Sequence, residues 1–178
     1  MKRIFAIGMI LLVLFGCKEK DNTKDISALY DGDISCTVRI EVQSEPAAEY
    51  IISFKREAQR DTVEILSPAS VDGITAQIER GSAAISYNGK YLQTLLPSYW
   101  GASPADVMSA VFDDLATSTP QRTVTDEQIM LEYKELTESA EMYRYVYLNK
   151  DTLAFERAEI EIDGQVLLRV SCTSFQAY

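Results

Sequence analysis

Few side chains in this sequence of 178 residues could carry out catalysis, because the chain contains no histidine and only three cysteines. Without histidine, neither a Ser-His-Asp nor a Cys-His relay can form. Ser103, in the stretch Gly101-Ala-Ser-Pro-Ala105, lacks the partner that a nucleophile needs, and we interpret it as a helix cap. The pairs Asp113-Asp114 and Asp126-Glu127 could bind a cation or exchange protons, but adjacent acids in so acidic a chain are usually solvated surface. We therefore expect no enzyme, no cofactor and no metal site.

Cys36 and Cys172 each lie within a Ser-Cys-Thr triplet, on the apolar phase of an alternating segment. If these segments are neighbouring strands, a location outside the cytoplasm would permit a disulfide bond between the two thiols. The alternative is a pair of buried free thiols that pack as small apolar groups.

The third cysteine, Cys17, follows a short N-terminal segment of a different character. Lys2 and Arg3 precede an apolar run, residues 4–15, that carries no charge. As a helix this run would be about 18 Å long, which is too short for a hydrocarbon core of about 30 Å, and it is typical of a secretion signal. The end of the run, Leu14-Phe-Gly-Cys17, resembles the lipobox of bacterial lipoproteins. The resemblance implies that Cys17 is lipidated with palmitate-like acyl chains, whereas in an ordinary signal peptide it would be a bystander.

These features divide the chain into three parts. We predict a lipoprotein signal peptide at residues 1–16, a lipidated N-terminus and polar tether at residues 17–31, and one folded domain at residues 32–178. The protein is then expected outside the cytoplasm, anchored to the cell membrane by its lipid. The formal net charge of −10 argues against nucleic acid as a partner and against attraction to anionic lipid headgroups.

Strands are the main elements that the pattern predicts. Apolar residues alternate with polar ones from 34 to 42, as in a half-buried antiparallel strand. Similar runs follow at residues 48–54, 63–65, 74–78, 85–87, 128–136, 142–148, 154–162 and 166–175. Asn88-Gly89 and Asp163-Gly164 indicate hairpin turns, and residues 118–125 a polar loop. At the second hairpin we favour a bulged three-residue loop, which places Ile160 beside Val166.

One helix is predicted after Ser103-Pro104, with Ser103 as its N-cap and a single apolar stripe along one side. The stripe requires an apolar surface, and only the face of a sheet is large enough. A helix of about 12 residues cannot cover the concave side of eight or more strands. Either an apolar cavity remains on that side, or a partner protein covers it.

Four segments share a pattern with a known family: Glu64-Ile-Leu-Ser-Pro68, Val71-Asp-Gly-Ile74, Ile85-Ser-Tyr-Asn-Gly-Lys90, and Ser103-Pro104 before the amphipathic helix. This pattern resembles the LolA/LolB-like lipoprotein-binding family. The resemblance implies an α+β, mainly β fold, in which a curved antiparallel incomplete barrel and a helical lid enclose an apolar cavity. A lipid anchor brings the chain closer to the family's anchored members. Among these are germination lipoproteins of spore-forming clostridia, which bind a cortex-modifying amidase.

Two functions are therefore expected. The first is binding of a hydrophobic ligand, such as the acyl chains of a lipid or lipoprotein, in a cavity lined by Val38, Ile40, Ile52, Phe54, Ile65 and Phe112. The alternative is a lipid-anchored interaction protein that docks and activates a cell-envelope enzyme, such as a spore-cortex amidase. Tyr143, Tyr145 and Tyr147 share one face of their predicted strand and are a candidate surface for such a partner, although ordinary sheet packing explains them equally well.

Overall fold

A computed structural model describes residues 23–79, 82–95, 100–137 and 140–178, so the predicted signal peptide and Cys17 lie outside the described residues. Within this part, eleven strands form one antiparallel sheet in the order β6-β5-β4-β3-β2-β1-β11-β10-β9-β8-β7. The strands are β1 (Ile34–Val42), β2 (Ala48–Glu57), β3 (Arg60–Ser67), β4 (Thr75–Glu79), β5 (Ser82–Tyr87), β6 (Lys90–Leu95), β7 (Gln121–Val124), β8 (Gln128–Leu136), β9 (Glu141–Asn149), β10 (Phe155–Ile162) and β11 (Gln165–Ala177).

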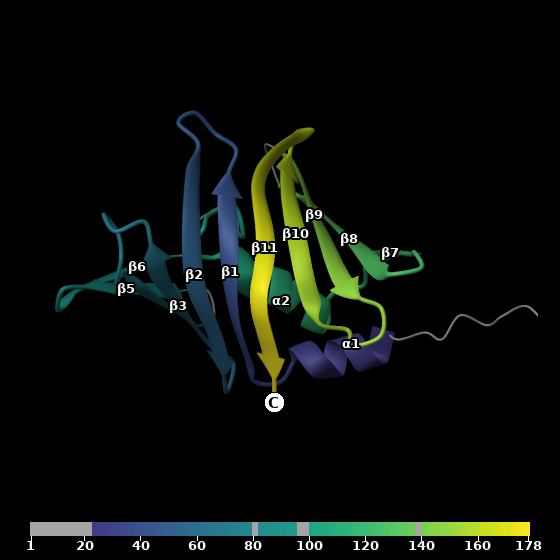
Figure 1. Ribbon diagram of the computed structural model, residues 1–178. Coiled ribbons are helices and arrows are strands. Elements are labelled where there is room, and N and C mark those ends of the chain that lie inside the picture. The colour runs from purple at the N-terminus through teal and green to yellow at the C-terminus, as the bar shows by residue number, and fades with distance from the viewer. Residues whose placement is uncertain (1–22, 80–81, 96–99, 138–139) are drawn as a thin grey trace, which may run out of the picture.

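The sheet bends around helix α2 (Val107–Thr117), which lies against its concave face behind β1, β11 and β10 in Figure 1. Helix α1 (Thr23–Tyr30) packs against α2 near the end of the sheet where the chain terminates. The predicted mainly β class, with a curved antiparallel sheet and a helix on its concave side, is confirmed. Among the described residues, neither helix is long and apolar enough to cross a membrane.

Apolar and polar residues alternate along β1, so one face of this strand contributes to the core. Ile34, Cys36, Val38 and Ile40 are buried on the concave face, whereas the residues between them are more accessible. The β5–β6 hairpin turns at Asn88-Gly89, where both residues have the positive φ angles of a tight two-residue turn. The predicted turn at this position is confirmed.

The predicted register of the β10–β11 hairpin is wrong. Asp163-Gly164 forms a two-residue turn with positive φ at both positions, so Ile162 pairs with Gln165. A register shift then follows, and Ile160 lies opposite Leu168 instead of Val166. The irregularity therefore sits in the strands rather than in the turn, and it brings Ile160 and Leu168 to the core together.

Helix α1 occupies residues that the sequence assigns to the tether, so that assignment is wrong for Thr23–Tyr30. Ile26 and Tyr30 are four residues apart and share the buried side of the helix. The Tyr30 hydroxyl donates a hydrogen bond to the Leu153 carbonyl oxygen at 2.8 Å. A short strand, β7, likewise replaces part of the predicted polar loop.

The predicted helix begins later than expected, at Val107, and Ser103 does not cap it. The backbone N–H and the hydroxyl of Ser103 both donate to Asp106 Oδ1, at 2.9 and 2.7 Å. Just before this turn, Gly101 has a φ of +85°, and a Cβ there would lie 2.6 Å from the Ala110 Cβ. The turn thus carries the chain so close to α2 that only glycine fits at position 101.

Candidate binding surfaces

Phe112 of α2 occupies the centre of the concave face. Its ring centroid lies 5.1 Å from that of Phe54 on β2 and 5.5 Å from that of Phe155 on β10, both in edge-to-face contact. The Tyr30 ring of α1 lies 5.3 Å away. One aromatic side chain therefore joins both halves of the sheet to both helices.

The structure brings together all six residues predicted to line the ligand site. Val38, Ile40, Ile52, Phe54 and Phe112 are fully buried in one hydrophobic cluster, and Ile65 is half-buried against it. These side chains lie in one cluster, in which Phe112 of α2 packs against the buried sheet residues. Their role as ligand contacts stays a prediction.

Apolar residues continue from this core toward the β6 edge of the sheet. In one row, Ile52 pairs with Ile65, whose N–H donates to the Ile74 carbonyl oxygen. A second row of paired residues runs from Phe54 through Ala76 and Ile85 to Leu92, and Tyr87 lies two residues after Ile85 on the same face of β5. Burial decreases along both rows, and Tyr87 is 41% and Leu92 63% exposed. We call the outer part of these rows the β3–β6 apolar face; its members are Ile65, Ile74, Ile85, Tyr87 and Leu92.

Two buried arginines, which the sequence analysis did not identify, hold α2 against the sheet. On β2, Arg56 Nε and one terminal nitrogen donate to the two carboxylate oxygens of Asp61, each at 2.7 Å. The same terminal nitrogen donates to Asp113 of α2 at 2.6 Å. Burial lowers the pKa of Arg56, but the bonds to the two carboxylates outweigh this effect, so the guanidinium stays charged.

Arg144 on β9 forms the matching contact on the other half of the sheet. Its Nε donates to Asp114 Oδ2 at 2.5 Å, and its terminal nitrogens donate to Glu135 on β8 and to the Trp100 carbonyl oxygen. Asp114 is therefore buried rather than solvated, whereas Asp113 is exposed, as the sequence suggested, and nevertheless binds Arg56. Each binds an arginine from a different half of the sheet, because adjacent positions on a helix point in different directions.

A signal for these arginines was present in the sequence. Arg56 follows Ile52 and Phe54 on the apolar phase of β2, and Arg144 stands between Met142 and Val146 on the apolar phase of β9. A charge at such a position must find a partner in the core. Asp61 lies close to Arg56 in the sequence. Asp113 and Asp114, however, lie on α2, far along the chain, so the sequence alone could not identify these helix partners.

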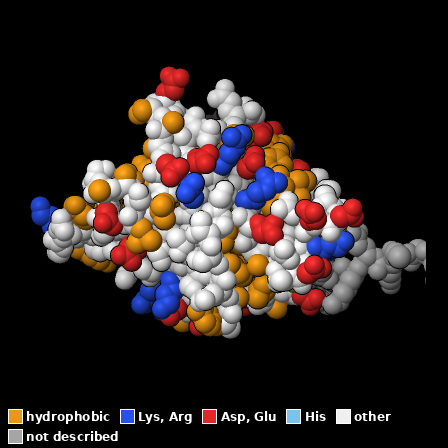
Figure 2. Space-filling model, in the orientation of Figure 1, with side chains coloured by type: hydrophobic (Ala, Val, Ile, Leu, Met, Phe, Trp, Pro, Cys, Tyr) orange, Lys and Arg blue, Asp and Glu red, His pale blue; other side chains and the backbone are white. Residues whose placement is uncertain are grey.

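The three tyrosines of β9 lie on the convex face and are half-buried. The rings of Tyr143 and Tyr145 stack with centroids 6.1 Å apart and planes 6° from parallel. The Arg157 guanidinium of β10 lies 3.5 Å from the ring centroid of Tyr147. Figure 2 shows orange side chains beside red and blue ones over this half of the convex face. The three residues thus share one face, as predicted, and their role as a partner surface stays a prediction.

Cys36 and Cys172 are free thiols on the adjacent strands β1 and β11. The register places Cys172 opposite Val38 and Cys36 opposite Phe175, so the two cysteines are diagonal rather than directly paired. Burial raises the pKa of both thiols, that of Cys172 to about 11. The strands are thus neighbours, which is the condition for the disulfide bond, and the bond itself stays a prediction.

The acid pair Asp126-Glu127 lies at a polar pocket whose other lining residues are Gln128, Asn149, Asp151 and Glu156. The Gln128 side-chain amide donates to one carboxylate oxygen of Glu156, and that of Asn149 donates to the other. In the described part of the chain, no group of three or more Cys, Asp or Glu side chains is arranged to hold a metal ion.

No protein-family model matches the sequence, and the search of curated proteins found no match. Solved structures do resemble it. An uncharacterised conserved protein from Thermus thermophilus aligns with a TM-score of 0.54 at 12% identity, covering 88% of this chain and 86% of that one. A LolA superfamily protein from Nitrosomonas europaea aligns with a TM-score of 0.48 at 12% identity, over 88% and 93% of the two chains.

A chain in the structure of the CwlD amidase from Clostridioides difficile in complex with the GerS lipoprotein aligns with a TM-score of 0.46 at 15% identity, over 89% of each chain. At these identities the likeness is one of fold alone. The chain thus shares its overall fold with the Thermus protein, and similar structures include members of the LolA superfamily that the sequence resembles.

Proposed function

We propose that this protein is a non-enzymatic, lipid-anchored extracytoplasmic protein that binds a hydrophobic ligand, such as the acyl chains of a lipid or lipoprotein, on its concave face. The observation that carries the proposal is the β3–β6 apolar face, where the core continues beyond α2 to the exposed side chains of Tyr87 and Leu92. Contiguous exposed apolar surface of this kind is typical of ligand-binding or protein-binding sites.

The six predicted contact residues fit this proposal as the inner part of the same surface. Ile65 lies where the covered core meets the β3–β6 apolar face, so a ligand can reach it directly. To reach Phe54 or the residues beneath Phe112, an acyl chain must displace α2. The ion pairs of Asp113 and Asp114 with the buried arginines oppose this displacement.

A second candidate function is the docking and activation of a cell-envelope enzyme, such as a spore-cortex amidase. The tyrosines of β9 favour it, because aromatic side chains that remain partly accessible on a sheet face are common in protein interfaces. They lie on the convex face, opposite the proposed ligand surface, so the two functions do not compete for the same residues.

Native mass spectrometry of the protein separates the two functions. A carrier is expected to retain lipid, visible as an added mass that organic solvent removes. A protein without added mass, which also gains none when incubated with palmitate, would contradict the proposed ligand.

The anchor is tested separately by Cys17→Ser. If the lipid at Cys17 provides the membrane attachment, this variant is expected in the soluble fraction, with the same circular dichroism spectrum as the parent protein. A variant that still sediments with membranes would contradict the lipidation of Cys17.

A further inference from the structure

Nine side chains from three adjacent strands form a regular grid on the convex face. Each β9 tyrosine lies opposite one β8 residue and one β10 residue: Lys134 and Glu161 flank Tyr143, Glu132 and Glu159 flank Tyr145, and Met130 and Arg157 flank Tyr147. Directly opposite residues in an antiparallel sheet share a face and lie close enough for their side chains to interact.

The two outer tyrosines each hold a cation of this chain. Arg157 lies over the ring of Tyr147, and one of its nitrogens is 3.3 Å from a carboxylate oxygen of Glu159. Lys134 lies 5.0 Å from the ring centroid of Tyr143 and binds Glu141 at 3.1 Å. The same unit, an aromatic ring with a cation that also binds a carboxylate, therefore occurs at both ends of the row.

In the described part of the chain, the central tyrosine has no cation over its ring, and of the two carboxylates beside it Glu159 already binds Arg157. Tyr145 lies between Glu132 and Glu159. Glu132 forms no ion pair within the described residues. Burial, followed by Glu161 and Glu132, raises the pKa of Tyr145, so its ring stays a neutral phenol.

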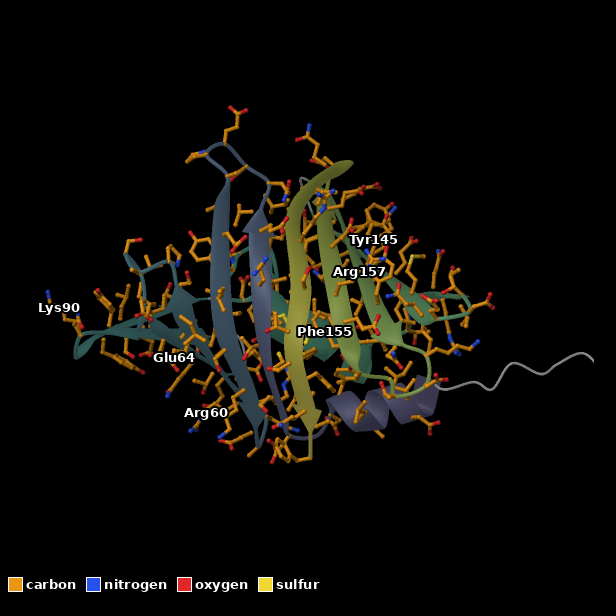
Figure 3. All side chains as sticks on the ribbon, viewed as in Figure 1. Arg60, Glu64, Lys90, Tyr145, Phe155 and Arg157 are labelled. Carbon is orange, nitrogen blue, oxygen red and sulfur yellow. The ribbon has the colours of Figure 1, made fainter. Side chains whose placement is uncertain are left out.

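We propose that Tyr145, together with Glu132, is the docking site for an arginine side chain of a partner protein. The proposal deepens the second candidate function, on which it rests, by naming the chemistry of the partner. A planar guanidinium can stack on an aromatic ring and donate two parallel hydrogen bonds to a carboxylate, whereas an ammonium acts as a point charge. Arg157 lies over the neighbouring ring of the same row and also binds Glu159, and Figure 3 labels both Tyr145 and Arg157 on this half of the sheet.

Other charges on this face shape the site without filling it. Arg169 of β11 lies opposite Glu159 and also opposite Glu41 of β1, so it is on the side of β10 away from Tyr145. Glu161 borders the site on the Tyr143 side. Carboxylates therefore border the central ring on both neighbouring strands.

The test uses a hexa-arginine peptide as the probe, with hexa-citrulline as its uncharged isostere, titrated into the protein by calorimetry at about 150 mM salt. Hexa-arginine is expected to bind and hexa-citrulline to bind much more weakly. Tyr145→Leu should weaken binding about tenfold, whereas Tyr145→Phe, which keeps the ring, should retain it. Glu132→Gln should weaken binding in the same direction.

Two variants on the other half of the convex face are matched controls. Tyr91→Leu removes an exposed tyrosine of β6, and Glu64→Gln neutralises an exposed acid of β3, labelled in Figure 3. Neither is expected to change the affinity. If Tyr145→Leu binds hexa-arginine as the parent protein does, or if the controls weaken binding equally, the cation is held by diffuse charge and the proposal is wrong. Palmitate retention does not depend on Tyr145, so this failure would leave the hydrophobic-ligand function standing.

Discussion

Arg144 of β9 binds Asp114 of α2 through a contact of 2.5 Å between Nε and Oδ2, and both side chains are almost fully withdrawn from water. The adjacent helix residue, Asp113, binds Arg56 of β2, which three strands separate from β9 in the sheet. Two consecutive carboxylates thus connect one helix to both halves of a curved sheet. This arrangement fixes where α2 lies and how much of the concave face it covers.

Arg144→Met is expected to destabilise the protein strongly, because it leaves the buried Asp114 without its cation. The expected loss is about 3–5 kcal/mol in the free energy of unfolding, measured by urea denaturation. Adding Asp114→Leu to this variant should restore part of the loss, since the unpaired charge is then removed. The matched control is Arg60→Met, which breaks an exposed pair with Glu79 and should cost less than about 1 kcal/mol. Equal losses for the two single variants would contradict a structural role for the buried pair.

The buried Asp106 gives a prediction about pH. Burial raises the pKa of its carboxyl, although the hydrogen bonds from Ser103 lower it in part. A raised pKa means that the folded state binds the proton more tightly than the unfolded state does. The stability contributed by this proton is complete below the ordinary value of 3.8 and is lost as the pH rises through the raised pKa.

Asp106→Asn removes the charge and keeps an acceptor for Ser103. The difference in stability between the variant and the parent protein should therefore favour the variant most at pH 7. This difference should become smaller as the pH falls toward 4. Thermal unfolding of both proteins across this range measures the difference. The exposed Asp72→Asn serves as the control. A difference that does not change with pH would show that Asp106 ionises equally well in the folded and unfolded states.

Cys172 is expected to react slowly with alkylating reagents when the protein is kept reduced. Burial raises the pKa of this thiol from 9.0 to about 11, so about a hundredfold less thiolate is present at pH 8 than for an ordinary cysteine. Iodoacetamide labelling of the folded protein, followed by mass spectrometry, measures the rate. Rapid labelling at pH 8, comparable to that of a cysteine in urea, would contradict this environment for the thiol.

Most strands could be predicted from the sequence because one face of each is buried, as the alternation around Val38 and Ile40 shows. Helix α1 was missed because only Ile26 and Tyr30 of its described side chains are fully buried, and the residues that Tyr30 contacts, such as Phe112 and Phe175, lie far along the chain. The shift that pairs Ile160 with Leu168 was not predictable from turn residues, since packing on the concave face decides it.

The candidate ligand surface was predictable only in part. The sequence identified the inner residues, such as Phe54 and Phe112, from their apolar phase. It did not indicate that Phe54 and Phe112 are buried against each other while Leu92 and Tyr87 remain exposed. That distinction depends on where the ion pairs of Arg56 and Arg144 place the helix, and these pairs connect residues far apart in the chain.

The most direct test of the hydrophobic-ligand function is the affinity of a fluorescent acyl-chain probe for two variants matched in chemistry. Leu92→Asp places a charge on the β3–β6 apolar face. Leu66→Asp places the same charge at an exposed leucine of β3 that points to the convex face of the sheet. If the acyl chain binds on this face, Leu92→Asp should weaken probe binding about tenfold or more, and Leu66→Asp should leave it unchanged. Equal binding by both variants and the parent protein would contradict the assignment of the ligand to the β3–β6 apolar face.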